Sequence, residues 1–416
     1  MQKVELVART TEINEVCTFN PESLNHDMVL LGGKAAGVCY MPDNYFEDGV
    51  QDEEKALIRA KGCKKSGHHS ALEHGHLTFV IQTNKIMAMV LNSINTYVTS
   101  EKSGRYTKMT GNTELEVDLY NKWMGIFKQI IAGYYTGTKT DKEIEKLAQE
   151  NARYMLDVFY PTTMMYTISY RELSYFIVHL TNLINSPANS ITVNQTFWER
   201  FVKSAQELID AFKEAVFYDE DYIIEDVKGG CIRFLDKYIN SDYTVLDSYS
   251  SVVSDNYSVL YRASFAEIAQ AQRHRTLRYS IFDICAGDYY VPVIIRNTPY
   301  EKEWIDDLDR LTNTGLIPSA TTCMINETGI IEDFVMKCKE RLCSRAQLEI
   351  CEVTSNCLEY MWKNVNKPNN LMSKYGVDLL RDMVDETGRP IPRCAFTGYV
   401  CHEPCARGKY GLIRNI

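Results

Sequence analysis

The stretch Ala271-Gln-Arg-His-Arg-Thr-Leu-Arg-Tyr-Ser280 places three arginines within six residues, around one histidine. An arginine keeps its charge in proteins, and its planar fork of donors matches phosphates and anionic ring edges. In the first half of the chain, Ser93-Ile-Asn95 is followed after seven residues by Ser103-Gly-Arg-Tyr106. The same gap separates Arg273-His-Arg275 from Asp283-Ile-Cys-Ala286. The two segments therefore indicate two copies of one pattern, each of which has kept a different part.

Three stretches together resemble the flavin-dependent thymidylate synthases, in which Arg-His-Arg, seven residues and Ser-Gly-Arg-Tyr form one continuous motif. Gly67-His-His-Ser-Ala-Leu-Glu-His74, with Leu77-Thr-Phe79 behind it, is similar to the family's Gly-His-x-Ser/Thr-x-x-Glu-His signature. Arg341-Leu-Cys-Ser-Arg-Ala-Gln-Leu-Glu-Ile350 is similar to its Arg-x4-Ala-Gln-x-Glu-Ile helix. The resemblance extends over nearly the whole chain, in two copies.

This resemblance implies an α/β (α+β) fold of two tandem domains, each a mainly antiparallel sheet with flanking helices. The first domain is expected at 1–217 and the second, with a cysteine-containing C-terminal tail, at 231–416. The acidic run Asp219-Glu-Asp-Tyr-Ile-Ile-Glu-Asp226, followed by Gly229-Gly230, predicts a linker at 218–230.

Hydrophobic periodicity predicts the main elements of both halves. Strands are expected at Val4–Arg9, Leu77–Ile81 and Val259–Tyr261, and helices at Asp141–Phe159, Trp198–Phe217 and Glu332–Ile350. The capping box Ser264-Phe-Ala-Glu267 predicts a further helix that ends near Arg275. On that helix Gln270, Arg273 and His274 would share one face.

Composition narrows the class of protein. A net charge of −10 argues against a protein whose main role is to bind nucleic acid. It is compatible with a local cationic pocket that binds phosphorylated small molecules. The longest apolar stretches, such as Ile86–Leu91, are too short to span a membrane, and the N-terminus lacks a secretory signal. Thirteen cysteines in a chain of 416 residues favour reduced thiols, and hence a cytoplasmic protein.

The resemblance implies one complete nucleotide-binding set, divided between the halves. The first half supplies Glu101, Ser103, Gly104, Arg105 and Arg153, and the second supplies Gln270, Arg273 and Arg341. Each half lacks the nucleotide-binding residues that the other half has. In the second half, Thr314 stands where the first half has Arg153. In the first half, Val90 and Leu180 stand where the second half has Gln270 and Arg341. Arg273, Arg341 and Ser103 are the expected catalytic residues, with Ser103 as a binding group.

The resemblance also assigns residues to the cofactor FAD. These are His68, Ser70, Glu101, Arg171, Arg273, His274 and Arg275. The family's two asparagines near the flavin ring are replaced here by Ser169 and Tyr175, and the second half's Ile330 and Met336 do not restore them. The geometry of the flavin or folate is therefore expected to differ from that of the family.

The implied function is FAD-dependent C5 methylation of dUMP to dTMP, with methylenetetrahydrofolate and NADPH as co-substrates. The expected assembly is a homodimer that forms a pseudo-tetramer, since the family's single-copy subunits assemble as tetramers. No general base lies at triad spacing from Ser103, so a serine nucleophile is not expected.

Other interpretations stay open at this point. Alone, the arginine stretch fits a solvated basic turn or a nucleic-acid patch. His68, His69, His74 and His76 invite a metal, but their spacing fits no standard zinc pattern. Cys394, Cys401 and Cys405 are interpreted as an ordinary tail, so no metal is expected. The alternative functions are a related C5 modification, methylation or hydroxymethylation, of another pyrimidine nucleotide, or a non-catalytic nucleotide-binding pseudoenzyme.

Overall fold

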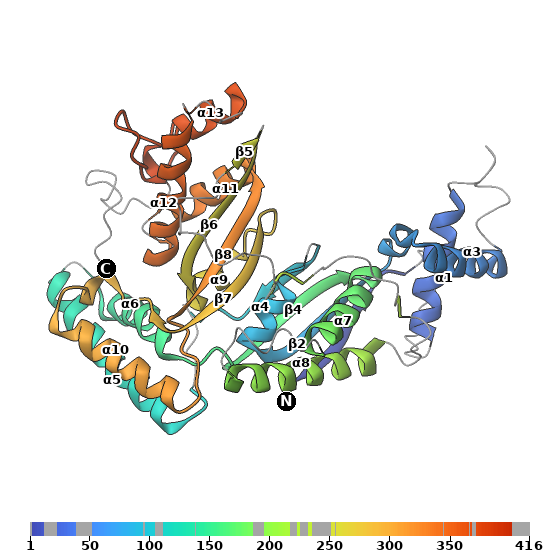
Figure 1. The fold of residues 1–416 in the computed structure, drawn as a ribbon, viewed down its shortest axis with the longest axis horizontal. Coiled ribbons are helices and arrows are strands. Elements are labelled where there is room, and N and C mark those ends of the chain that lie inside the picture. The colour runs from blue at the N-terminus through green and yellow to red at the C-terminus, as the bar shows by residue number, and fades with distance from the viewer. Residues whose placement is uncertain are drawn as a thin grey trace. The chain divides into compact units, whose positions relative to one another are not determined.

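The computed structural model describes residues 2–11, 23–38, 52–94, 96–104, 111–137, 139–185, 195–216, 223–224, 232–234, 251–253, 255–343, 345–365, 367 and 372–401. The chain forms two compact units (Figure 1). Unit 1 comprises Met1–Lys102 and Pro161–Arg233, and unit 2 comprises Ser103–Tyr160 and Phe234–Ile416. The first half of the chain thus contributes a segment to unit 2.

Unit 1 is built on a four-stranded antiparallel sheet in the order β1-β2-β4-β3. Its strands are β1 (Lys3–Arg9), β2 (His76–Asn84), β3 (Val98–Glu101) and β4 (Pro161–Ser169). Side chains alternate across a strand, so Leu77, Phe79 and Ile81 of β2 are all buried on one face. Phe79 is paired with Tyr166, which is buried on the same face of β4.

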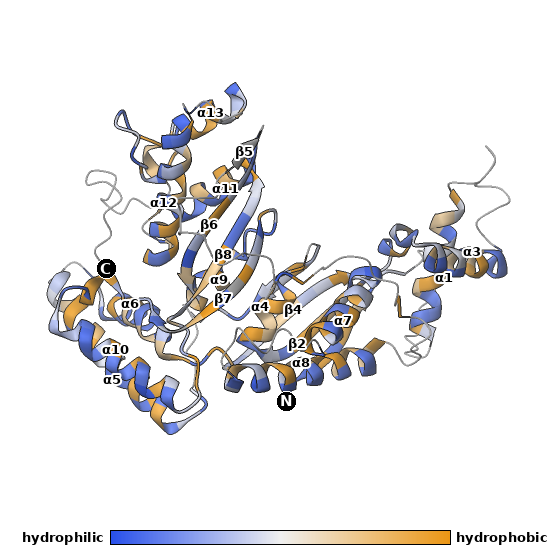
Figure 2. Ribbon diagram, viewed as in Figure 1, coloured by the Kyte–Doolittle hydropathy of each residue, from blue (hydrophilic) through white to orange (hydrophobic). Residues whose placement is uncertain are grey.

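Helices cover the buried face of this sheet. They are α4 (Lys85–Leu91), α7 (Tyr170–Ile184) and α8 (Gln195–Val216). Figure 2 shows polar and apolar residues alternating along α8, whose buried side chains include Phe201, Leu208 and Phe212. Each such side chain stabilises the unit by about 1.5–3 kcal/mol when it leaves water.

A separate group of helices in unit 1 consists of α1 (Leu24–Gly37), α3 (Glu53–Ser66) and the 3-10 turn η3 (His69–Glu73), which also contacts α7. The two helices are in close contact at Gly33, where an added Cβ would lie 1.9 Å from the carbonyl oxygen of Ala56. Arg59 donates its Nε–H to the carbonyl oxygen of Gly33 at 3.2 Å. Glycine at this position is therefore required by close packing.

Unit 2 contains a second four-stranded antiparallel sheet, in the order β5-β6-β8-β7. Its strands are β5 (Ser251–Val253), β6 (Asn256–Ser264), β7 (Arg278–Tyr289) and β8 (Thr321–Ile330). In both sheets the second strand leads directly into a seven-residue helix, α4 after β2 and α9 (Phe265–Ala271) after β6. The sheets therefore share strand order and connection. The tandem duplication itself stays a prediction.

The remaining elements of unit 2 are helical. They are α5 (Glu114–Tyr134), α6 (Asp141–Ala152), η4 (Arg153–Met155), η7 (Val293–Ile295), α10 (Pro299–Asn313), α11 (Ile331–Arg341), α12 (Leu348–Asn364), α13 (Lys374–Arg381) and η8 (Arg393–Ala395). The apolar cluster that joins α5 to α10 centres on Trp123 and Trp304, whose rings meet edge to face at 4.7 Å. Burial of these aromatic rings fixes residues 103–160 in unit 2.

The predicted α/β (α+β) class with antiparallel sheets is confirmed, as are the three predicted strands and the helix at Trp198–Phe217. The predicted helix Asp141–Phe159 is wrong beyond Ala152. There the backbone finds partners elsewhere, because Asp157 N–H donates to Glu116 at 2.8 Å and Val158 N–H donates to the carbonyl oxygen of Ile317 at 2.8 Å. The linker residues lie mostly outside the described residues.

The predicted single helix Glu332–Ile350 is also wrong, because it is divided into α11 and α12. Leu342 ends α11 with a ψ of +49°, and its carbonyl oxygen accepts from Arg393 N–H at 2.7 Å, so the helix does not continue. The helix after Ser264 ends at Ala271, before the basic triplet. Its capping box is half formed, since Ser264 accepts from Glu267 N–H but the carboxylate of Glu267 does not return the bond.

Candidate functional site

The basic triplet lies in a series of tight turns after α9. His274 N–H donates to the carbonyl oxygen of Ala271 at 2.9 Å, and Leu277 N–H donates to that of His274 at 3.0 Å. His274 is consequently buried, Arg273 is half-buried and Arg275 is exposed. The arginines and the histidine therefore do not share one helical face, and His274 alone is directed into unit 2.

His274 holds Arg341 in place. Arg341 donates its Nε–H to Nε2 of His274 at 2.8 Å, and its Nη2 approaches the carbonyl oxygen of Gln270 at 3.4 Å. Burial, together with the charges of Arg341 and Lys337, lowers the pKa of His274 to about 2. The guanidinium can only donate, so Nε2 of the neutral ring is the acceptor and Nδ1 carries the proton.

Arg153 belongs to the same unit and is held by a hydrogen-bonded chain. Its guanidinium donates to Oε1 of Gln347, whose Nε2 donates to the hydroxyl of Tyr154. Tyr154 in turn donates to Oε2 of Glu349 at 2.7 Å. The sequence predicted that Arg153 binds the nucleotide, but it did not predict the roles of Gln347, Tyr154 and Glu349. Gln347 and Glu349 belong to the Ala-Gln-x-Glu part of the motif that begins at Arg341.

Two buried polar atoms at residues predicted to bind the nucleotide have no hydrogen-bond partner among the described residues. They are Nε of Arg153, a donor, and Oε1 of Gln270, an acceptor. Leaving such an atom unpaired in the interior costs about 1–3 kcal/mol. Orphaned atoms of this kind fit a ligand that offers both donors and acceptors.

Ser103 and Gly104 also lie in unit 2. Gln149, on α6, donates its Nε2–H to the carbonyl oxygen of Gly104 at 3.2 Å, and α6 is the helix that ends just before Arg153. Arg105 lies outside the described residues. Ser103, Gly104, Arg153, Gln270, Arg273 and Arg341 are thus brought into one compact unit from both halves of the sequence.

Glu101 belongs to unit 1, and its side chain is buried. Its carboxylate accepts from Nζ of Lys85 and from the hydroxyl of Thr162 at 3.3 Å. A charge removed from water needs such partners, and Lys85 provides the opposite charge.

Unit 1 carries the other residues assigned to a cofactor. His68 and Ser70 are exposed at the 3-10 turn η3. Arg171 pairs with Glu73 of that turn and lies over the ring of Tyr175 at 4.9 Å, while its buried Nε lacks a partner among the described residues. An exposed hydroxyl, an imidazole and an unsatisfied guanidinium N–H together fit an anionic, phosphate-bearing group.

Unit 2 contains a buried charged cluster near Arg341. Lys337 donates to Oε2 of Glu327 at 2.5 Å, and Glu327 also accepts from the hydroxyls of Tyr257 and Tyr261. Burial raises the pKa of Glu267 to about 8, against the opposing charge of Lys337. Glu267 is consequently largely protonated at neutral pH.

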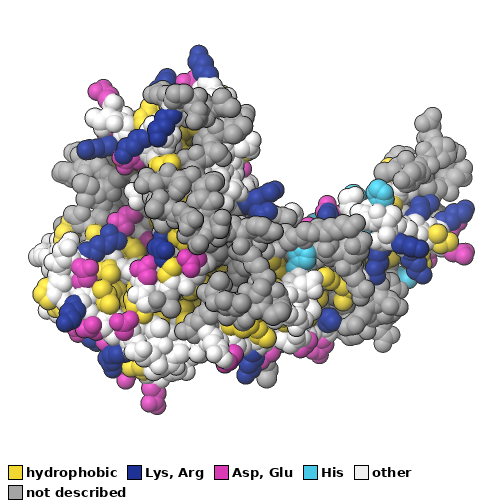
Figure 3. Space-filling view, in the orientation of Figure 1, with side chains coloured by type: hydrophobic (Ala, Val, Ile, Leu, Met, Phe, Trp, Pro, Cys, Tyr) yellow, Lys and Arg dark blue, Asp and Glu magenta, His cyan; other side chains and the backbone are white. Residues whose placement is uncertain are grey.

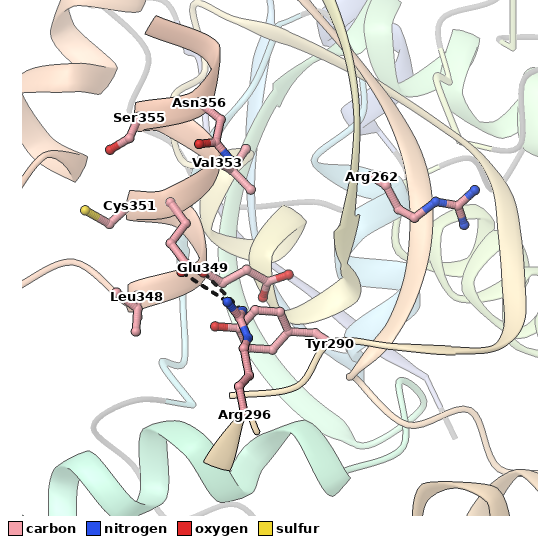
Figure 4. A pocket seen from close by; sticks show the side chains of 10 residues that line it. Arg262, Tyr290, Arg296, Leu348, Glu349, Cys351, Val353, Ser355 and Asn356 are labelled. Carbon is pink, nitrogen blue, oxygen red and sulfur yellow. Dashed lines mark hydrogen bonds and ion pairs between the residues drawn. The ribbon is translucent and has the colours of Figure 1, made fainter. Parts of the chain in front are cut away.

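A pocket of about 400 Å³ opens beside α12 (Figure 4). Its guanidinium groups are already paired, because Arg296 binds Glu352 at 3.2 and 3.3 Å and Arg262 binds Asp288 at 3.2 Å. Figure 3 shows basic and acidic side chains interspersed over much of the visible surface. The guanidinium groups of this pocket could therefore bind an anion only by giving up their carboxylate partners.

The described part of the chain contains neither a candidate metal site nor a candidate membrane span. There, no group of three or more histidine, cysteine, aspartate or glutamate side chains could hold a metal ion. His402 and Cys405 lie outside it. No helix within the described ranges is long and apolar enough to cross a membrane.

The protein has an α+β fold. Its unit 2 contains arginines from both halves of the sequence, together with buried polar atoms that lack a partner among the described residues, and these groups suit a phosphorylated small molecule. Residues 25–185 match the family model of the thymidylate synthase complementing protein. Over these residues the chain is similar to that family, and the resemblance to flavin-dependent thymidylate synthases is confirmed.

One similar curated protein is the flavin-dependent thymidylate synthase of Thermococcus onnurineus (strain NA1). It is 29% identical over 143 residues, which are 31% of this chain and 54% of the relative. The chain therefore spans about half the length of the curated relative that it matches.

Two solved structures are also similar. The thymidylate synthase X of Helicobacter pylori with FAD and dUMP has a TM-score of 0.31 at 18% identity, covering 54% of this chain and 98% of that one. The UMP/dUMP methylase PolB of Streptomyces cacaoi bound with 5-Br dUMP has a TM-score of 0.30 at 16% identity, covering 54% of this chain and 93% of that one. Likenesses at these TM-scores decide nothing about the chemistry of this chain.

Proposed function

We propose that the protein methylates C5 of dUMP to give dTMP, with FAD as cofactor. The supporting observation is that Arg153, Gln270 and Arg341, which come from different halves of the sequence, lie in one compact unit. Arg153 is hydrogen-bonded to Gln347 at the start of α12, and Arg341 to the carbonyl oxygen of Gln270 on α9. The unpaired Nε of Arg153 and Oε1 of Gln270 suit a nucleotide's acceptors and donors.

The nucleotide is proposed to bind Glu101, Ser103, Gly104, Arg105, Arg153, Gln270, Arg273 and Arg341. Arginines suit the phosphate because each can donate two parallel hydrogen bonds to it. Arg273 and Arg341 are proposed to stabilise the charge that develops on the pyrimidine during the reaction, with Ser103 as a binding hydroxyl. The tandem domains 1–217 and 231–416 are part of the same proposal.

FAD is proposed to be held by His68, Ser70, Glu101, Arg171, Arg273, His274 and Arg275. His274 is neutral in this structure, so its contribution would be to orient Arg341 rather than to add charge. Bound FAD, once reduced, supplies hydride. We propose methylenetetrahydrofolate as the one-carbon donor and NADPH as the source of reducing equivalents.

The first test is the substitution of one arginine from each half. Arg105→Ala and Arg273→Ala are each expected to weaken dUMP binding by roughly 30- to 150-fold and to lower dTMP formation accordingly, since losing a charged phosphate contact costs roughly 2–3 kcal/mol of binding. Arg381→Ala, in an exposed i,i+3 pair with Asp378 on α13, is the matched control and is expected to leave turnover unchanged.

Substrate choice is tested by comparing dUMP, UMP and dCMP with the yellow, FAD-loaded protein. Turnover of dUMP above the other two supports the proposal. A protein that binds dUMP without turnover, or that modifies only UMP or dCMP, would contradict it in favour of a pseudoenzyme or of another acceptor.

A further inference from the structure

Helix α9 begins with a hydrogen bond from an unexpected partner. Ser264 caps the helix by accepting from Glu267 N–H at 3.1 Å. In a capping box Glu267 would accept from Ser264 N–H in return. Instead, Ser264 N–H donates at 2.9 Å to Oε1 of Glu349, 85 residues later, and the Ser264 hydroxyl donates at 2.7 Å to Oε2. Glu349 thus takes the place of the capping-box glutamate.

The same carboxylate ends the chain that starts at Arg153. Oε2 of Glu349 accepts from Tyr154, which accepts from Gln347, which accepts from Arg153. In each of these bonds the residue closer to Glu349 along the series is the acceptor, and the residue closer to Arg153 is the donor. The direction is consistent throughout, because guanidinium and amide N–H groups can only donate and the carboxylate can only accept.

Glu349 therefore joins two elements that carry predicted nucleotide ligands. One is η4, which begins with Arg153, and the other is α9, which carries Gln270 and leads into the turn of Arg273. Figure 4 shows Glu349 on the side of α12 that faces Tyr290, while Cys351 and Ser355 point away from it. The Tyr154 ring is stacked on that of Tyr290 at 4.9 Å, which limits its freedom further.

We propose that Glu349 is a positioning residue that holds Arg153 and α9 in the arrangement required to bind the pyrimidine nucleotide. This inference rests on the proposed function. Glu349 itself does not touch the nucleotide, and its effect is transmitted through Tyr154 and Gln347 on one side and through Ser264 on the other.

A carboxylate suits this position better than an amide of the same shape. Three donors converge on its two oxygens, and in a glutamine one of those oxygens would become an NH2 group that faces a donor. Burial raises the pKa of Glu349, and its bonds to Ser264 and Tyr154 oppose that rise. The nearby Glu267 does not compete for the donors, because its two oxygens have no partner among the described residues.

The test compares Glu349→Gln with Glu352→Gln, which makes the same change nearly one turn later on α12, at a half-exposed residue paired with Arg296. Titration of the FAD-loaded full chain with dUMP is expected to show affinity reduced about tenfold in Glu349→Gln and unchanged in the control. In turnover assays the KM for dUMP should rise more than kcat falls. Amide exchange at Glu267 N–H is expected to accelerate, because the cap is loosened.

A double-mutant cycle separates positioning from general damage. If Glu349 acts through Arg153, adding Glu349→Gln to Arg153→Ala should weaken dUMP binding far less than it does in the wild type. Additive losses would overturn the inference, as would wild-type affinity in Glu349→Gln.

A milder variant covers the case in which Glu349→Gln does not fold. Tyr154→Phe removes one hydroxyl from the chain and keeps the stacked ring, and it is expected to weaken dUMP binding in the same direction. Unchanged affinity in Tyr154→Phe would overturn the inference. Wild-type protein that binds no pyrimidine nucleotide would overturn the proposed function and this inference with it, whereas failure of the variants alone leaves the proposed function standing.

Discussion

Arg341 and His274 form a hydrogen bond of 2.8 Å in which the cation is the donor and the neutral imidazole is the acceptor. A protonated ring could not accept this bond, and its charge would repel the guanidinium. The pair therefore couples the proton content of His274 to the position of Arg341, one of the residues proposed to bind the nucleotide.

The free energy of unfolding should decrease as the pH falls, because His274 is held neutral in the folded protein. Its pKa is lowered to about 2 in the folded protein, against about 6.5 when unfolded, so below pH 6.5 the unfolded chain takes up a proton that the folded one does not. The stability contributed by the neutral ring is complete above pH 6.5 and is lost as pH falls, by up to about 1.4 kcal/mol per pH unit. In His274→Gln, whose amide oxygen can still accept from Arg341, this part of the slope should disappear.

The measurement is urea unfolding between pH 7 and pH 5, followed by tryptophan fluorescence. Trp123, Trp304 and Trp362 of the four tryptophans belong to unit 2, so the signal reports mainly on the unit that contains His274. His74→Gln, at an exposed residue, is the control. Equal slopes for wild type and His274→Gln would contradict the prediction.

Glu267 should make the free energy of unfolding depend on pH in the opposite direction. Its pKa is raised by burial to about 8, so between about pH 4.5 and pH 8 the folded chain holds a proton that the unfolded chain releases. Stability is then lost as pH rises through that window. Glu267→Gln removes the titration and should stabilise unit 2 at pH 7 by on the order of 3 kcal/mol. Thermal unfolding at pH 5 and pH 8 checks this, with the exposed Glu386→Gln as control, and a stabilisation that does not grow with pH would count against it.

Asp307 should be required for the junction of α5 with α10. Its buried carboxylate accepts from Lys122 at 2.5 Å, from Nε1 of Trp123 at 3.0 Å and from Arg310 at 2.9 Å. Asp307→Ala leaves the indole N–H buried without a partner and should cost about 2–3 kcal/mol, less than a fully buried pair because Lys122 is partly exposed. Asp306→Ala, its exposed neighbour, should cost little. Urea midpoints that coincide for the two variants would refute the assignment.

We expect the protein to be a dimer with one FAD and one dUMP per chain. Two tandem copies in each chain would let a dimer reuse the interfaces of a tetramer under twofold symmetry. In the proposed duplication the second-half counterpart of Ser103 would be Asp283, an exposed carboxylate at φ +49° that would repel a phosphate. Sedimentation velocity at micromolar concentration and equilibrium titration check both numbers. A monomer, or two equivalent nucleotide sites per chain, would contradict them.

Several elements could be predicted from the sequence because their signals are local. The alternation of Leu77, Phe79 and Ile81 predicts a strand with one buried face, and the apolar periodicity of α8 predicts its helix. The end of α6 and the break before Gln347 could not be predicted, since both depend on partners far away in the chain. Asp157 N–H bonds to Glu116, and Gln347 bonds to Arg153.

For the candidate site, too, some features follow from the sequence and others only from the tertiary structure. The sequence by itself indicated the resemblance to the family and the residue types of the expected site, because arginines, glycine and glutamine stand at the spacings of the family's motifs. Only the tertiary structure decided that residues 103–160 belong with the second sheet, that His274 is a neutral acceptor, and that Glu349 replaces Glu267 at the start of α9. The physical reason is that hydrogen-bond partners and burial are set by whichever groups folding brings within reach. A local pattern such as Ser-x-x-Glu states which bond is available, and the packing of distant segments decides which bond is made.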